Sequence, residues 1–110
     1  SMEQLEAAKS VGAAVTEFHT GRFVELCLAG KGAEAGEECE RIRECAEKAV
    51  ELGIEPQAGH GLTYDTVIPI AEIPQLTELN IGHFLIGEAV FVGLDASIRR
   101  MRELMDEARA

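Results

Sequence analysis

A chain of 110 residues, 46% of them hydrophobic, has room for one domain with a packed core. Its formal net charge of −10 argues against a nucleic-acid-binding surface, because phosphate backbones are bound by clustered lysine and arginine. No apolar run reaches the roughly 18–20 residues of a membrane span. The first residues do not form a signal peptide, so we expect a cytoplasmic protein.

The cysteines and the first two residues carry little information about function. Cys27, Cys39 and Cys45 lack paired C-x-x-C spacing, which indicates neither a disulfide framework nor a zinc site. Ser1 and Met2 look like an expression remnant, so we treat residues 3–110 as the folded unit.

Hydrophobic periodicity, together with glycine and proline positions, divides the chain into alternating helices and strands. The expected elements are a helix at 3–10, a strand at 14–19, a helix at 37–52, a strand at 54–58, a short helix at 65–71, a strand at 76–81 and two helical pieces at 84–92 and 95–108. Gly12 and Gly53 are placed at helix ends, and Gly93 separates the last two pieces. Asp65 is the expected cap of the short helix, which Pro69 is expected to distort.

Residues 20–36 contain four glycines and are predicted to be a long loop, with a short helical turn at 23–28. Loops of this length in compact domains are usually functional. The apolar stripe at 42–52 is predicted to be core, and the charges at 99–109 a solvated helix face.

Connections of these lengths allow parallel strands joined by right-handed crossovers, which gives an α/β fold with about three parallel strands. His60 and His83 are 23 residues apart, the size of a short repeated βα unit, so we expect part of a (β/α) barrel. A complete barrel needs eight strands and usually more than about 200 residues, which this chain does not have.

All three histidines, His19, His60 and His83, close short strand-like runs, so successive units should place them on one common rim. In the first strand, Glu17 and His19 share a face by the period-two rule. Histidine exchanges protons near neutral pH, and glycines beside it let backbone N–H groups approach a phosphate closely. We therefore expect chemistry at this rim.

Four segments carry a family resemblance: E-F-H-T-G at 17–21, A-G-H-G-L-T-Y at 58–64, E-L-N-I-G-H at 78–83, and A-V-F-V-G-L-D-A-S-I-R-R-M-R-E-L-M at 89–105. They closely resemble the C-terminal part of the pyridoxine 5′-phosphate synthases, and essentially the whole chain is covered. That family is a TIM barrel. The resemblance implies the last three strands with their helices, a partial barrel completed by self-association or by the missing segment.

The resemblance also implies an activity for the parent enzyme, the condensation of 1-deoxy-D-xylulose 5-phosphate with 3-amino-2-oxopropyl phosphate to pyridoxine 5′-phosphate. The family requires neither a cofactor nor a metal. By motif, His60 resembles the family's proton donor, Gly61 a backbone contact to the amino-ketone phosphate, and Gly82 and His83 the phosphate-holding segment.

Glu17 resembles the carboxylate with which the family stabilises the transition state, and we expect it to be partly desolvated among the strands. His19 either orients Glu17 or caps the following loop. The family's other acid–base residues, a histidine and a glutamate from early strands, have no counterpart in this chain.

Other interpretations stay open. The histidines could be structural or form a His₃ metal site, and the glycines at 59, 61 and 82 could serve turns alone. The chain could be a non-catalytic, self-associating barrel fragment, since uncovered parallel strands need a partner, and a homo-oligomer is expected. It could also belong to another phosphate-binding TIM-barrel enzyme.

Overall fold

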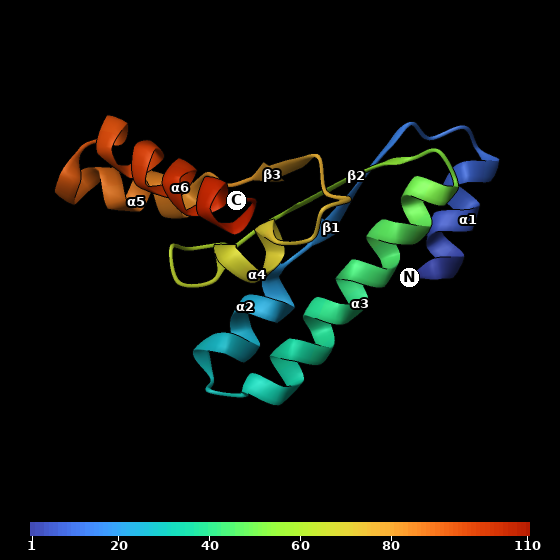
Figure 1. The fold of residues 1–110 in the computed structure, drawn as a ribbon, viewed down its shortest axis with the longest axis horizontal. Coiled ribbons are helices and arrows are strands. Elements are labelled where there is room, and N and C mark those ends of the chain that lie inside the picture. Colours follow the sequence, from blue (N-terminus) through green and yellow to red (C-terminus); the bar gives the residue numbers. More distant parts are fainter.

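The computed structural model describes all of residues 1–110 and shows an α/β fold with three strands (Figure 1). The elements in chain order are α1 (Met2–Ser10), β1 (Val15–His19), α2 (Gly21–Leu28), α3 (Gly32–Glu51), β2 (Glu55–Gly59), α4 (Val67–Ala71), β3 (Glu78–Asn80), α5 (His83–Val92) and α6 (Leu94–Ala108). No helix is long and apolar enough to cross a membrane.

The three strands form one parallel sheet in the order β1-β2-β3, as expected from the helical connections. The register sets Glu17 beside Gln57, and Gln57 beside Glu78. One pleat further along, His19 lies beside Gly59. β3 is shorter than the predicted strand at 76–81, because Leu76 is still in a turn. The N–H of Leu76 donates to the carbonyl of Ile73.

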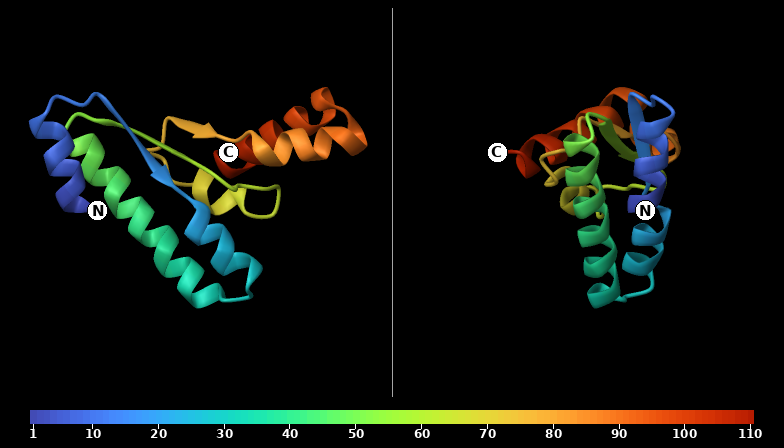
Figure 2. Two further views of the ribbon diagram at one scale, coloured as in Figure 1. Left: turned by 180° about the vertical axis from the view of Figure 1, so that it is seen from behind. Right: turned by 90° about the vertical axis from the view of Figure 1, so that its right-hand side faces the viewer.

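Helices cover only one face of this sheet. Figures 1 and 2 show α2 and α3 running side by side, with α5 and α6 packed together at the opposite end of the molecule from α1. The main core lies between the sheet and α2, α3 and α4, and Ile42, Ala58 and Ile70 in it are fully buried. The burial of side chains alternates at the start of β2: Glu55 is exposed, whereas Pro56 and Ala58 are buried.

The other face of the sheet is open. Its exposed side chains are those of Val15, Glu17 and His19 from β1, Glu55 from β2, and Glu78 and Asn80 from β3. We call these six residues the open face. Parallel sheets normally have both faces covered, so a three-stranded sheet with one bare face and two unpaired edges is consistent with part of a (β/α) barrel.

The predicted long loop at 20–36 is wrong, because most of it is helical. α2 occupies 21–28 and α3 begins at Gly32, five residues before the predicted start, which leaves only 29–31 as a connection. The four glycines at 21, 30, 32 and 36 suggested a loop, but of these four only Gly30 has a positive φ, 72°. Tertiary burial of Phe23 and Val24 overrides the weak helix propensity of the glycines.

Other boundaries follow the expected residues more closely. Gly12, Gly53 and Gly93 have φ of 81°, 76° and 88°, the left-handed values that suit glycine after a helix. The cap of α4 is Thr66 rather than Asp65, and Pro69 is the third residue of this helix. The N–H groups of a first helical turn have no partner inside the helix, so proline is tolerated there.

The first residues have a structural role in the chain as it stands. The Ser1 hydroxyl accepts a hydrogen bond from the N–H of Gln4 at 3.3 Å, and the Gln4 side chain accepts one from the Ser1 amino group. This capping box begins α1. That Ser1 and Met2 are an expression remnant stays a prediction.

Candidate active site

A hollow of about 500 Å³ lies at the carboxyl ends of the strands. Its wall is formed by Glu17, His60, Gly61, Leu62, Asn80, Ile81, Gly82 and His83. Five of the six residues predicted from the sequence are in this wall, and the sixth, His19, is in contact with His60. Hollows of roughly 300–1,000 Å³ are typical of small-molecule sites, and ligands of parallel α/β folds bind at this end of the strands.

His19 and His60 stack on one another. Their ring centroids are 4.0 Å apart and the ring planes are inclined by 27°. His19 closes β1 and His60 follows β2, so the neighbouring strands bring together two imidazoles that are 41 positions apart in sequence. His83 is in the wall of the same hollow, at the start of α5. The predicted rim of histidines is thus formed at one end of the sheet.

The backbone around His60 is unusual. His60 has a φ of 85° and is the only non-glycine residue in the chain with a positive φ. Gly61, which follows it, has a φ of 78°. Side chains with Cβ atoms rarely adopt this conformation, and such residues are concentrated at functional sites.

Thr20 holds this segment in place and was missed by the sequence reasoning. Its hydroxyl lies 2.8 Å from the carbonyl oxygen of Gly59 and 2.6 Å from that of His60, and it donates its single hydrogen to this pair. The N–H of Thr20 also donates to Gly59. Thr20 is fully buried, and its place in the E-F-H-T-G motif was the available signal.

Glu17 lies on the open face with its carboxylate bound by Asn80. The Asn80 Nδ2 donates to Glu17 Oε2 at 2.6 Å and, at 3.3 Å, to Gln57 Oε1 on the strand between them. Our expectation that Glu17 is partly desolvated is wrong, because nothing covers this face and its side chain is exposed. Asn80 was also missed, although its place in the wall follows from the strand register.

Two of the three glycines considered for turns have identifiable structural roles. A Cβ on Gly59 would lie 2.7 Å from the carbonyl oxygen of Asn80, so only glycine allows β2 and β3 to approach this closely. Gly61 is needed for its positive φ. Gly82 has open space around it and a negative φ, so neither crowding nor backbone strain requires glycine there.

Gly82 precedes α5 as its N-cap, and no side chain caps this helix. In the first backbone hydrogen bond of the helix, the N–H of Ile86 donates to the carbonyl of Gly82. The N–H groups before Ile86 therefore have no acceptor within the helix. This end of the helix faces the hollow through Gly82 and His83, and helix N-termini attract anions.

The polar groups do not come together as a set of metal ligands. No group of three or more histidine, cysteine, aspartate or glutamate side chains is placed to hold a metal ion. The three cysteines are free, and burial raises the pKa of the Cys27 and Cys39 thiols.

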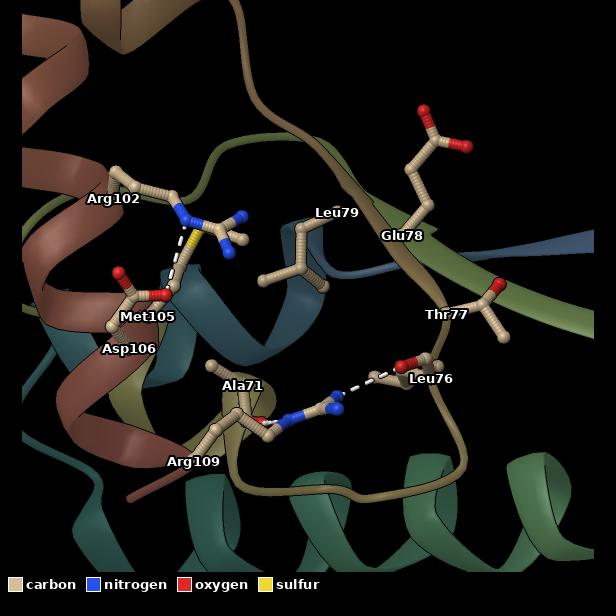
Figure 3. Close-up of a pocket in the computed structure, with 9 residues that line it drawn as sticks. All are labelled: Ala71, Leu76, Thr77, Glu78, Leu79, Arg102, Met105, Asp106 and Arg109. Carbon is tan, nitrogen blue, oxygen red and sulfur yellow. Dashed lines mark hydrogen bonds and ion pairs between the residues drawn. The ribbon is translucent and has the colours of Figure 1, made fainter.

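A second, smaller hollow of about 180 Å³ lies between α6 and the chain leading into β3 (Figure 3). Its two guanidinium groups already have partners within the chain. Arg102 pairs with Asp106 at 3.0 Å, and Arg109 donates to backbone carbonyls on either side of the turn before β3. The carboxylate of Glu78 points away from this hollow in Figure 3. We therefore place the candidate site in the larger hollow.

Comparison with known proteins identifies the family of the chain. The family model described as "Pyridoxal phosphate biosynthesis protein PdxJ" matches residues 1–107. The chain belongs to the PdxJ family. Pyridoxine 5′-phosphate synthase of Cereibacter sphaeroides is 55% identical over 98% of this chain, and that of Ruegeria pomeroyi is 55% identical over 97%. The Caulobacter vibrioides enzyme of the same name is 52% identical over 97%.

This PdxJ chain spans less than half the length of those relatives. It covers 43% of the Cereibacter and Ruegeria proteins and 42% of the Caulobacter protein. The matched range includes every residue in the wall of the hollow, together with His19 and Thr20. The open face of the sheet is consistent with this partial coverage.

Proposed function

We propose that this chain carries part of the site at which a pyridoxine 5′-phosphate synthase condenses 1-deoxy-D-xylulose 5-phosphate with 3-amino-2-oxopropyl phosphate. The observation that supports the proposal is the assembly of Glu17, His60, Gly61, Gly82 and His83 around one hollow of about 500 Å³. These residues come from three separate βα junctions. The names of the relatives point to the same product, pyridoxine 5′-phosphate.

In this proposal the start of α5 binds a substrate phosphate. The unbonded N–H groups of its first turn and the positive end of the helix dipole favour an anion beside Gly82 and His83. Gly61 contributes a backbone contact to the amino-ketone phosphate, which its missing side chain and left-handed conformation allow. The substrate is then held between the ends of β2 and β3.

His60 is the proposed proton donor. Imine formation, dehydration and ring closure need protons delivered and removed near neutral pH, which suits an imidazole. The carboxylate of Glu17, held in place by Asn80, faces the same hollow and can stabilise positive charge that develops on an imine. His19, stacked on His60, supports that ring.

We propose that residues 3–110 are the C-terminal βα units of a TIM barrel and that the chain alone is inactive. The open face and the unpaired edges of β1 and β3 support completion by association. α5 has no buried residue, and its Val90 and Phe91 are 81% and 84% exposed. These exposures favour a second candidate, a non-catalytic fragment that associates with itself as a homo-oligomer.

Isothermal titration of the folded chain with 3-amino-2-oxopropyl phosphate tests the phosphate site. We expect saturable binding that is lost in His83→Ala and kept in Arg99→Ala, which removes a cation on the exposed face of α6. Absence of binding by the wild-type chain, or equal binding by His83→Ala, would contradict the proposal. Binding of inorganic phosphate but not of the amino-ketone phosphate would indicate another phosphate-binding enzyme.

Turnover and light scattering test the second candidate. Synthesis of pyridoxine 5′-phosphate by the chain alone would exclude the purely non-catalytic fragment and our expectation of inactivity. A concentration-dependent mass without turnover, lowered towards the monomer by Phe91→Ser, would support self-association through α5. A monomer at all concentrations would exclude the homo-oligomer.

A further inference from the structure

The left-handed conformation of His60 needs a cause. A non-glycine residue at a φ of 85° is energetically unfavourable and persists only where its surroundings impose it. The His60 side chain is exposed at the hollow, so burial of its ring does not supply that energy. The fixed contacts of this segment come from the chain that joins β1 to α2.

Thr20 supplies the backbone part of those contacts. It is the N-cap of α2, where a threonine hydroxyl ordinarily accepts a hydrogen bond from the next helical turn. No such capping bond is formed here. The hydroxyl instead donates to the carbonyl oxygens of Gly59, at 2.8 Å, and of His60, at 2.6 Å. These two carbonyl groups lie directly before and after the Cα atom of His60.

His19 and Gly21 supply the side-chain part. The N–H of Gly21 donates to His19 Nδ1 at 3.3 Å, which fixes the ring of His19 and leaves its exchangeable proton on Nε2 in the neutral form. His60 stacks on this fixed ring with centroids 4.0 Å apart. A Cβ on Gly21 would lie 2.6 Å from His19 Cε1 and 3.1 Å from His60 Cδ2, so the stack requires glycine at this position.

We infer that His19, Thr20 and Gly21 form a positioning device for His60, with Thr20 orienting its backbone and the His19–Gly21 pair orienting its ring. None of the three residues lines the hollow. Each acts on His60 and not on a substrate, so they are positioning residues. The catalytic meaning of this device rests on the proposed role of His60 as proton donor, whereas the device itself is a property of the free chain.

The decisive variant is Gly21→Ala, with Gly32→Ala as its matched control. Both glycines are the first residue of a helix, neither has a positive φ, and a Cβ on Gly32 would meet nothing within 4 Å. The atom nearest to the new Cβ of Gly21→Ala is the far end of the His19 ring, which can swing away, so the chain should stay folded.

Proton NMR of the histidine rings gives the readout without any substrate. We expect a nuclear Overhauser contact between the His19 and His60 rings in the wild type and in Gly32→Ala, and its loss in Gly21→Ala. The amide signals of α3 and α6 should stay in place in all three proteins. Retention of the ring contact in Gly21→Ala would overturn the inference, as would its absence from the wild type.

Thr20→Val tests the hydroxyl, with Thr20→Ser as its rescue and Thr16→Val as its control. Thr16 lies on β1, shortly before Thr20 in the chain, and makes no side-chain hydrogen bond, so its variant changes a nearby threonine without touching His60. We expect His60 signals to shift in Thr20→Val and to return in Thr20→Ser. Equal His60 signals in a folded Thr20→Val chain would refute the role of the hydroxyl. If Thr20→Val does not fold, a Thr20→Ser chain with displaced His60 signals would refute it.

Because these measurements need no substrate, they separate the device from the proposed activity. Loss of the ring contact in Gly21→Ala, combined with no binding of 3-amino-2-oxopropyl phosphate by the wild type, would leave the positioning device standing and reject the function. The reverse result would leave the function standing and reject the device.

Discussion

Arg109 follows α6 and ties the end of that helix to the turn before β3. Its guanidinium donates to three backbone carbonyls. Nε donates to Ala71 and Nη2 to Leu76 at 2.8 Å, as Figure 3 shows, and Nη2 also donates to Ile73 at 2.9 Å. These carbonyls belong to the end of α4 and to the turn that leads into β3. We therefore expect Arg109→Gln to destabilise the chain more than a typical surface substitution.

The size of the effect follows from the number and exposure of these bonds. A hydrogen bond from a charged donor contributes about 1.5–3 kcal/mol when buried. Arg109 is exposed, so water can replace it at the carbonyls, and fixing the long side chain costs about 2 kcal/mol of rotamer entropy. The net loss should be about 1–3 kcal/mol, which lowers the urea midpoint by roughly 1 M.

Urea unfolding followed by circular dichroism measures this loss, and Arg99→Gln is the control. Arg99 is on α6 and pairs with Asp95, and the two side chains are 67% and 87% exposed. Such exposed pairs are worth less than about 0.5 kcal/mol. Arg109→Lys should resemble Arg109→Gln, because one ammonium cannot reach all three carbonyls. Equal midpoints for Arg109→Gln and Arg99→Gln would refute the reasoning.

Three further predictions concern α3. Ile42 is fully buried, so Ile42→Val should lower the free energy of unfolding by about 0.5–1.5 kcal/mol in urea titrations, whereas Val50→Ala on the exposed face should change it by less than about 0.5 kcal/mol. Burial raises the pKa of Cys39, so at pH 8 its thiol should react with a disulfide reagent more slowly than free cysteine; an equal rate would contradict this. The hydrogen bond from Arg41 lowers the pKa of Glu38, so the pair stabilises the fold above the ordinary carboxyl pKa and loses this effect as the pH falls through the lowered value. The free energy of unfolding of Arg41→Gln should therefore be lower than that of the wild type by less than about 1 kcal/mol at pH 7, and this difference should vanish in acid. A difference that persists in acid would contradict the assignment to this pair.

Side-chain periodicity, together with glycine and proline positions, predicted the order of the elements except for α2, and it predicted one face of the sheet. Alternation in the first strand placed Glu17 and His19 together, and both lie on the open face. The glycines at 12, 53 and 93 marked real helix ends, because each occupies a left-handed position. Local signals succeed where the physics is local, as it is in strand alternation and helix termination.

The errors lie where tertiary packing decides. Nothing local distinguishes Gly21 and Gly32, which begin helices, from Gly30, which ends one. The role of Thr20 depends on carbonyl groups 39 and 40 positions away, and that of Asn80 on Glu17, 63 positions away. The strand register sets such partners. A hydrophobic pattern indicates which face of the sheet a side chain is on, but not which residue of the neighbouring strand lies beside it.

The open face connects the candidate chemistry with the incompleteness of the sheet. Glu17, Glu55 and Glu78 all lie on it, and no lysine or arginine does. Asn80 and Gln57 already donate to two of these carboxylates, Glu17 and Glu55. Covering this face would remove the carboxylates from water, which is strongly unfavourable unless each one is paired or hydrogen-bonded. A segment or partner that completes the sheet must therefore bring donors or cations to this face, and a purely apolar cover would not fit it.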